Sequence, residues 1–406
     1  MIKRYPIKYK DGKMSRGIVI DWAAVKKEYR RLKIPKQYYY PLKADFSRVG
    51  YVISMSDRSR GKTTQILILG LVLYAMYGEQ LQYIRQLKSQ CEPKMIRNLY
   101  AVVLECGYIS KIFGDQWNSI FYRGKRWYLC RVNENGEIEE KDSTHCTACF
   151  GVDECFDIKS TYNAPLGDIV LYDEFISDRM GYNEFRDFCD MCKTIFRDRY
   201  GTVCFLAANT INKNSRWFDE YAIADTVRKM EQGDTQEVAS PLGSHFFIEI
   251  MTANASEDRA YTNRRMFGFH NPKLAAITGR GTWAEESFPH IPPDPDDERE
   301  QVHMMCNRIF IEMNGQLMKL AVVRNPEIGI CVYVTPATKL YDDSVIFTAD
   351  EVKDRRYVFL FGKGLPVNFV WDLYTKGRWY YAHNAAGCWI RAYVTYAQGK
   401  LRNMTR

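Results

Sequence analysis

Apolar and polar positions in the first part of the chain predict strands joined by helices. A largely apolar run at 49–55 has the length of a buried strand, and the Leu-, Ile- and Ala-rich run 65–77 after it has the length of a helix. Residues 82–86 predict a second strand, and residues 93–106 predict a second helix. Because strand, helix and strand in succession are typical of a parallel sheet, we expect an α/β fold.

The pattern continues to about residue 255. Residues 119–160 alternate around a turn at 133–136, which predicts a β-hairpin excursion from the sheet. Apolar runs further on predict buried strands at 168–175, 202–210 and 243–253, and a helical pattern covers 183–199. The basic N-terminal stretch 1–46 contains an amphipathic segment at 20–32.

The composition changes after residue 255, which predicts a division into domains. Residues 256–300 are irregular and end in a Pro-rich acidic stretch, so we interpret them as a linker or lid subdomain. From residue 301 the pattern is rich in strands, with Asn314-Gly315 between alternating apolar runs as a hairpin signal. The predicted boundaries are therefore 1–255, 256–300 and 301–406, and the last domain is of α+β type.

Composition and charge narrow the class of protein. A length of 406 residues is enough for two or three domains. The excess of 57 Lys and Arg over 49 Asp and Glu is compatible with a polyanionic partner but is also common among soluble proteins. Since no apolar run has the length of a bilayer span and no signal-peptide core follows the N-terminus, we expect a cytosolic protein without membrane contact.

Cysteine spacing raises the possibility of a zinc site. The chain has 12 cysteines, among them Cys146-x-x-Cys149 beside His145, Cys155, and Cys189-x-x-Cys192. The distance between the two pairs exceeds zinc-ribbon spacing, and the second pair lies in a helical pattern. Reduced thiols in the core are therefore the favoured interpretation.

The turn between the first strand and the first helix has the pattern of a phosphate-binding loop. Residues 56–63 fit G-x-x-x-x-G-K-[ST], except that Ser56 stands where the first glycine is usual. Gly61 allows the backbone N–H groups to face phosphate oxygens, Lys62 supplies a charge for the β- and γ-phosphates, and Thr63 offers a hydroxyl to Mg²⁺. The nucleotide-binding candidates are Ser56, Arg60, Gly61, Lys62, Thr63, Thr64 and, as an aromatic partner for adenine, Tyr40 of the Tyr38–Tyr40 cluster.

Two later strands end in polar residues that complete this chemistry. Asp173 and Glu174 follow the apolar run 169–172, at the end of a strand where α/β sheets bind ligands. Asp173 is a candidate Mg²⁺ ligand, and Glu174 is a candidate for polarising the attacking water. Asn209, at the tip of the next strand, is a candidate sensor of the γ-phosphate.

The order of five segments resembles that in the DNA-packaging ATPases of tailed bacteriophages, and most closely the small-podovirus branch. These segments are the loop 56–64, the strand 83–85, Asp168–Glu174, Phe196–Arg199 and Ala207–Thr210. That family has an arginine inside a deviant phosphate loop, a strand ending in Asp-Glu-Phe and a strand ending in Ala-Asn. Here these are Arg58, 173–175 and Ala208-Asn209. The likeness covers most of residues 47–255. The expected fold is a P-loop NTPase core of the additional strand division, followed by a smaller ribonuclease H-like domain.

The resemblance implies a motor that hydrolyses ATP with Mg²⁺ and moves double-stranded DNA into a procapsid. A homo-oligomeric ring, with five subunits as the expected number, would act in the host cytoplasm at the portal vertex, with an accessory RNA as a further candidate partner. A neighbouring subunit would supply a positive charge to the transition state, for which Arg197 and Arg199 are the candidates, and Arg58 would act within the loop.

The resemblance implies that residues 301–406 stand where large terminases have a ribonuclease H-like nuclease, but we expect no nuclease activity. Two-metal cleavage needs several carboxylates on adjacent strands. The acids available, Glu312, Asp342, Asp343, Asp350, Glu351 and Asp372, do not assemble into such a set. DNA or portal contact is expected instead, through Lys353, Arg355, Arg356, Lys376, Arg378 and Trp379.

Two other classes share the phosphate loop. A P-loop helicase or DNA-repair ATPase would use the same core on single-stranded nucleic acid, and the sequence leaves this alternative open. A GTPase would need a guanine-reading Asn-Lys-x-Asp motif, which the stretch 212–215, Asn-Lys-Asn-Ser, does not supply.

Overall fold

The computed structural model describes residues 2–14, 17–56, 60–159, 162, 166–176, 184–197, 199–209, 213, 215–252, 288–289, 303–313, 316–325, 328–349, 352–362 and 367–404. The chain divides into two compact units. Unit 1 comprises residues 1–213 and 217–284, and unit 2 comprises residues 214–216 and 285–406. Most of the predicted linker 256–300 lies outside the described residues.

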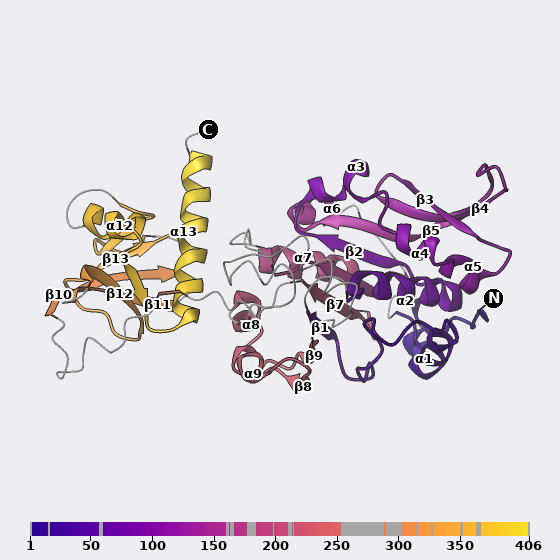
Figure 1. Cartoon of the computed structure of the whole chain (residues 1–406), viewed down its shortest axis with the longest axis horizontal. Helices are drawn as coiled ribbons and strands as arrows, with labels where there is room; N and C mark the ends of the chain where they lie inside the picture. The colour runs from indigo at the N-terminus through magenta and orange to yellow at the C-terminus, as the bar shows by residue number, and fades with distance from the viewer. Residues whose placement is uncertain are drawn as a thin grey trace, which may run out of the picture. The chain divides into compact units, whose positions relative to one another are not determined.

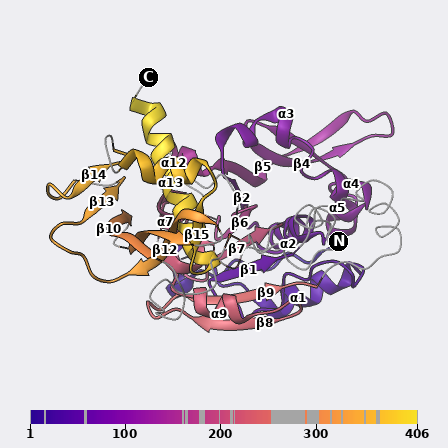
Figure 2. The same cartoon turned by 60° about the vertical axis from the view of Figure 1, so that its left-hand side comes forward.

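In unit 1, the described residues form a nine-stranded mixed sheet in the order β3-β4-β5-β2-β6-β7-β1-β9-β8 (Figures 1 and 2). From β5 to β9 the neighbouring strands are parallel, and both ends of the sheet are antiparallel. The strands are β1 (Tyr51–Met55), β2 (Leu81–Arg85), β3 (Ser119–Arg123), β4 (Arg126–Val132), β5 (Ile138–Gly151), β6 (Ile169–Asp173), β7 (Val203–Ala208), β8 (Thr235–Ala239) and β9 (His245–Ile250).

Helices cover the sheet on both faces. Apolar side chains of α1, α2, α4 and α5 form one core with the strands, and those of α6 to α9 form a second core on the other face. The helices are α1 (Trp22–Arg31), α2 (Lys62–Tyr77), α3 (Pro93–Ile96), α4 (Ala101–Glu105), α5 (Tyr108–Phe113), α6 (Cys155–Ile158), α7 (Glu184–Phe196), α8 (Arg216–Glu220) and α9 (Ala224–Lys229), with short 3-10 helices η1 (Lys10–Gly12), η3 (Lys88–Cys91) and η4 (Val152–Glu154).

The helix after the predicted phosphate loop has clear local causes. Gly61, with φ 72°, precedes its first turn, and Gly78, with φ 78°, ends it by donating its N–H to the Tyr74 carbonyl at 2.8 Å. Both positions need a left-handed backbone, which glycine adopts at little cost. Between them α2 is apolar on nearly every side and is buried almost throughout, so it forms the centre of its face.

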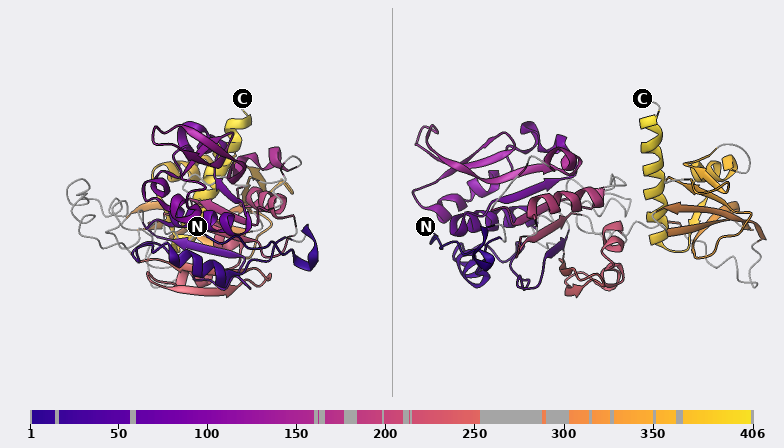
Figure 3. Two further views of the ribbon diagram at one scale, coloured as in Figure 1. Left: turned by 90° about the vertical axis from the view of Figure 1, so that its right-hand side faces the viewer. Right: turned by 180° about the vertical axis from the view of Figure 1, so that it is seen from behind.

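The sheet differs from the sequence expectation at its two ends. The predicted hairpin around 133–136 is present as β4 and β5. Residues 119–160 are not an excursion, however, because the second half of β5 pairs in parallel with β2 and so extends the main sheet. At the other end, β8 pairs antiparallel with β9. The sequence does not predict β8, since its residues are mostly exposed and polar. Figure 3 shows unit 1 from two further sides.

Unit 2 contains a six-stranded sheet in the order β14-β13-β10-β11-β12-β15. Strands β10 to β12 form an antiparallel meander, while β13 and β14 continue the sheet in parallel beside β10. The predicted Asn314-Gly315 turn lies outside the described residues, but the two strands that it joins are paired as expected. The elements are β10 (His303–Met313), β11 (Gln316–Asn325), β12 (Gly329–Ala337), β13 (Val345–Thr348), β14 (Tyr357–Phe359), α12 (Val367–Thr375), β15 (Trp379–Tyr381) and α13 (Asn384–Met404).

Within the part of the chain that is described, no helix combines the length and the apolar character that crossing a bilayer requires.

Candidate nucleotide site

The strand order brings the predicted site residues together at one edge of the sheet. Strand β7 lies between β1, which leads into the loop 56–61, and β6, which ends in Asp173. These strands are parallel, so their carboxyl ends meet at the same edge. Asn209, directly after β7, therefore lies between the loop and the acids.

Lys62 begins α2 and is 4% exposed. Its Nζ contacts the Ser56 hydroxyl and donates to Asn209 Oδ1 at 3.1 Å. The serine that replaces the usual glycine thus contacts the lysine that is expected to bind phosphate. Nearby, the carbonyl of Arg60 accepts the Tyr39 N–H at 2.9 Å, which ties the N-terminal arm to the loop.

The two threonines begin α2 together with Lys62, and one of them contacts the first acid. Thr63 Oγ1 donates to Asp173 Oδ1 at 2.9 Å. A hydroxyl and a carboxylate in contact are ligands that Mg²⁺ prefers, and they adjoin the helix N-terminus where phosphates are expected to bind. These two side chains therefore fit a Mg²⁺ ion bound together with a nucleotide.

Glu174 follows β6 in a left-handed backbone conformation, with φ 59°. Its carboxylate accepts from Arg85 Nη2 at 2.7 Å and from Asn209 Nδ2 at 3.2 Å. A left-handed conformation is unfavourable for glutamate by about 1–2 kcal/mol. Such strain often marks functional residues, because the surrounding contacts must hold it in place.

Arg85 and Tyr83, at the end of β2, are functional candidates that the sequence reasoning did not assign. Besides Glu174, Arg85 contacts Asp173 Oδ2 at 3.3 Å, and the Tyr83 hydroxyl donates to the same oxygen at 2.8 Å. Burial alone would lower the pKa of Arg85, but Tyr83, Asp173 and Glu174 together raise it. Burial and then Asp173 raise the pKa of Tyr83, which keeps it a hydrogen-bond donor.

Comparisons with known proteins agree with this architecture. No family model and no curated protein match the sequence. The structure is similar to the Phi-28 gp11 DNA packaging motor, with a TM-score of 0.56 and 15% identity over 90% of this chain and 99% of that one. It is also similar to a chain of the bacteriophage Phi-29 viral genome packaging motor assembly, with a TM-score of 0.57 and 16% identity over 91% and 100% of the two chains. The chain has the fold of phage DNA-packaging motors.

The resemblance inferred from the motifs is thus confirmed at the level of the packaging-motor fold. Not every predicted site residue joins the cluster, however. Arg58 lies outside the described residues. Tyr40 is half-buried and meets the Tyr29 ring edge-on at 5.7 Å, while Tyr38, 40% exposed, lies beside Gly61, where an added Cβ would come within 3.2 Å of its ring.

The two candidate trans arginines occupy different surroundings. Arg197 follows α7, is exposed, and donates from Nη2 to the Tyr162 carbonyl at 2.7 Å. Arg199 is buried and forms an ion pair with Asp168, at the start of β6 and so at the opposite end of that strand from Asp173. Because it is enclosed within its own subunit, Arg199 is a poor candidate for a neighbour's site, and we retain only Arg197.

The zinc interpretation finds no support among the described residues. They contain no group of three or more His, Cys, Asp or Glu side chains placed to hold a metal, and Cys146, Cys149, Cys155, Cys189 and Cys192 are free thiols. Burial raises the pKa of Cys146 to about 12, as expected of a thiol within the core.

The Asp168–Arg199 pair belongs to a buried cluster with a second acid, Glu79, which accepts the Asp168 backbone N–H. Glu79 and Asp168 are each 1% exposed. Burial and then the Asp168 charge raise the pKa of Glu79 well above its usual range. Burial raises the pKa of Asp168 as well, although Arg199 opposes this. One guanidinium therefore faces two buried carboxyl groups.

We expect Glu79→Gln to reduce the pH dependence of stability. A carboxyl group with a raised folded-state pKa contributes stability below its ordinary pKa of 4.5, and this contribution is lost as the pH rises through the folded-state value. Relative to the variant, the native chain should lose up to about 1.4 kcal/mol of unfolding free energy per pH unit above about pH 5. Urea unfolding across this range, with exposed Glu139→Gln as control, measures the difference. Parallel pH profiles for the native chain and Glu79→Gln would contradict this prediction.

Proposed function

We propose that the chain is an ATP-driven translocase that packages double-stranded viral DNA into a procapsid. The observation that carries the proposal is the convergence of Lys62, Thr63, Asp173, Glu174 and Asn209 at one sheet edge, in a chain with the fold of packaging motors over nine-tenths of its length. Strand β7 between β1 and β6 supports the additional strand division of P-loop ATPases.

Each polar group has a role that its position supports. The N-terminus of α2 and Lys62 bind the ATP phosphates. Thr63 and Asp173 would hold Mg²⁺, which would neutralise charge on the phosphates. Glu174 orients and polarises the attacking water. Asn209, which contacts both Lys62 and Glu174, senses whether the γ-phosphate is present.

Arg85 contacts both acids, and these contacts have a consequence for the proposed ATPase cycle. Glu174 contacts Arg85 at 2.7 Å, so its carboxylate is partly neutralised in this arrangement. A Mg²⁺ ion held by Thr63 and Asp173 would compete with the Arg85 guanidinium for the Asp173 carboxylate. Glu174 is then freed to act on water only after nucleotide has bound.

The effect of DNA on ATP turnover tests the proposed function against the helicase alternative. A packaging translocase should be stimulated by duplex DNA, and a helicase or repair ATPase by single strands. ATP turnover is measured with a blunt duplex and with a single strand of the same sequence. Stimulation by the single strand alone would favour the alternative, and Mg²⁺-dependent turnover that neither nucleic acid changes would contradict both.

The motor is proposed to be a homo-oligomeric ring, with five subunits as the expected number, in which Arg197 completes the neighbour's site. Rings mixed from Glu174→Gln and Arg197→Ala subunits should regain part of the activity that each variant lacks alone. Some interfaces in such rings join an intact Glu174 to an intact Arg197, and only these are active. Turnover is measured across mixing ratios. If mixed rings form and no ratio restores activity, Arg197 does not act in trans.

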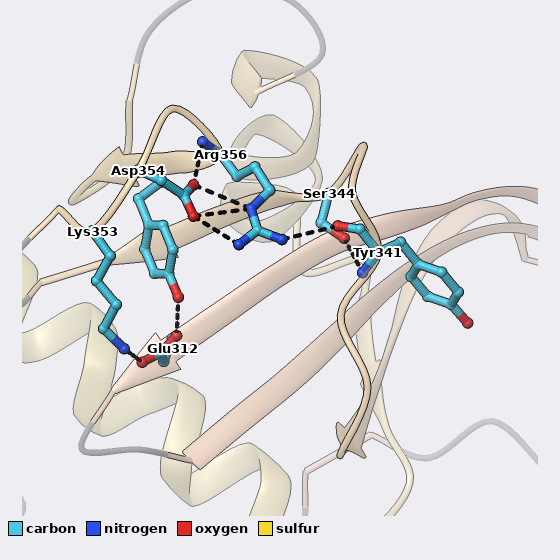
Figure 4. A network of polar contacts seen from close by, with 7 residues as sticks. Glu312, Tyr341, Ser344, Lys353, Asp354 and Arg356 are labelled. Carbon is cyan, nitrogen blue, oxygen red and sulfur yellow. Dashed lines mark hydrogen bonds and ion pairs between the residues drawn. The ribbon is translucent and has the colours of Figure 1, made fainter.

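Unit 2 is proposed to be a ribonuclease H-like domain that contacts DNA or the portal. The meander β10–β12, with β13 and β14 parallel beside β10, supports this fold. Figure 4 shows Lys353 bound to Glu312. Glu312 also accepts a hydrogen bond from the Tyr357 hydroxyl at 2.6 Å. Trp379 is 2% exposed and packs on Trp371, so the prediction of a surface contact for it is wrong.

We expect the full chain to leave plasmid DNA uncut in Mg²⁺ or Mn²⁺. Thr348, not an acid, pairs with Glu312 on the adjacent strand. Asp372 Oδ2 forms an ion pair with Lys376 Nζ at 2.6 Å. Asp343 Oδ1 lies 3.5 Å from Arg308 Nε. Asp350 and Glu351 lie outside the described residues. Gel electrophoresis of supercoiled plasmid measures cleavage, and cutting that disappears in Glu312→Ala or Asp372→Ala would overturn the prediction.

A further inference from the structure

We propose that the outer face of β3, β4 and the adjoining part of β5 binds single-stranded nucleic acid. We call this surface the β3–β5 platform and define it by Phe121, Arg123, Arg126, Tyr128, Lys141 and His145. It lies in unit 1, at the end of the sheet farthest from β8, and it includes none of the residues assigned to ATP.

Three rings form the centre of the platform. Phe121 and Tyr128 are cross-strand partners whose rings stack at 5.4 Å between centroids, with an interplanar angle of 20°. Tyr128 also pairs across the strands with His145, whose ring meets it edge-on at 6.0 Å. The adjacent Trp127 and Leu129 point into the core, whereas Phe121 and Tyr128 belong to neither core of unit 1.

Three cations surround these rings. Arg123 and Arg126 are exposed and lie directly opposite each other across the strands, and Lys141 Nζ lies 5.4 Å from the centre of the Phe121 ring. Among the described residues, no carboxylate lies within ion-pair distance of these three side chains, whereas nearby Arg131 pairs with Glu139 and Glu140. Like charges directly opposite each other destabilise a strand pair, and a bound polyanion would relieve this repulsion.

His145 contributes a ring and not a charge. Burial and then the proximity of Arg126 lower its pKa to about 4, so the imidazole is neutral near pH 7. The platform therefore combines aromatic rings with fixed guanidinium and ammonium groups. This is the chemistry that binds unpaired bases and their phosphates, because stacking needs a base face that a duplex does not expose.

Binding of labelled oligonucleotides to the full chain tests the proposal. We would measure fluorescence anisotropy with oligo(dT), oligo(U) and a short DNA duplex. Phe121→Ala/Tyr128→Ala should weaken single-strand binding by about tenfold or more while duplex affinity changes by less than about threefold. Phe156→Ala is the matched control, because Phe156 is an aromatic residue 65% exposed outside the platform. Whichever of oligo(dT) and oligo(U) binds more tightly shows whether the platform prefers single-stranded DNA or RNA.

A second variant is independent of the packing of the rings. Arg123→Ala/Arg126→Ala removes two exposed side chains and should reduce the slope of log affinity against log salt by about 1.4 for single strands. The control is Lys27→Ala/Arg30→Ala on α1, which removes the same number of positive charges outside the platform. Unchanged single-strand affinity and salt slope in both platform variants would overturn the proposal, as would an equal loss for duplex. Duplex-stimulated ATP turnover, measured in parallel, reports separately on the proposed motor function.

Discussion

Glu174→Gln is expected to bind ATP with an affinity within about threefold of the native chain and to hydrolyse it about 10²–10⁴-fold more slowly. Glutamine keeps the shape of the side chain and can still accept the hydrogen bond from Asn209 Nδ2. It lacks the negative charge that polarises the attacking water. The loss therefore falls on the chemical step and not on ground-state binding.

Binding is measured with a fluorescent ATP analogue, and turnover by phosphate release. Glu154→Gln is a matched control, because Glu154 is a buried glutamate that pairs with Lys125 and Lys88 away from the nucleotide site. That variant should keep turnover within about tenfold of the native rate. Near-normal turnover in Glu174→Gln would remove Glu174 from its assigned role, and loss of ATP binding would place it among the binding residues instead.

The residues at the ends of β6 and β7 are predictable from the sequence for a simple reason. Both strands are buried throughout, so their residues form unbroken apolar runs whose ends are marked by the first polar side chains. Parallel pairing then brings Asp173, Glu174 and Asn209 to one edge. In the structure Asn209 contacts both Lys62 and Glu174, while Asp173 contacts Thr63 beside Lys62.

The role of Arg85 cannot be predicted from the local sequence, because it depends on which strand lies beside β6. The chain order does not tell that β2 is this neighbour, and only the pairing of β2 with β6 brings Arg85 to the acids. The same limit applies to Arg199, whose buried partner Asp168 lies 31 residues earlier in the chain. Local patterns record burial and turns, whereas pairing between distant segments is settled by the packing of the whole sheet.

Lys62→Ala is expected to weaken ATP binding by about 100-fold or more, the opposite outcome to Glu174→Gln. Lys62 is the buried cation at the start of α2, with its ammonium group beside Ser56 and Asn209 where the β- and γ-phosphates are expected. Charge-assisted hydrogen bonds contribute about 1.5–3 kcal/mol each, and the ammonium has several phosphate oxygens within reach. Its loss therefore acts on the ground-state complex.

Lys62 and Glu174 both form a hydrogen bond with Asn209. Lys62→Ala should nevertheless impair ATP binding, whereas Glu174→Gln should impair hydrolysis. Alanine at position 62 leaves Asn209 with Glu174 as its partner, so the acid remains in place while the phosphates lose their cation. Raising the ATP concentration should then recover part of the turnover of Lys62→Ala, whereas no concentration recovers that of Glu174→Gln. Lys88→Ala, which removes a surface lysine paired with Glu154, controls for loss of charge. Tight ATP binding by Lys62→Ala, in a variant whose thermal melt matches the native chain, would show that this lysine does not bind the phosphates.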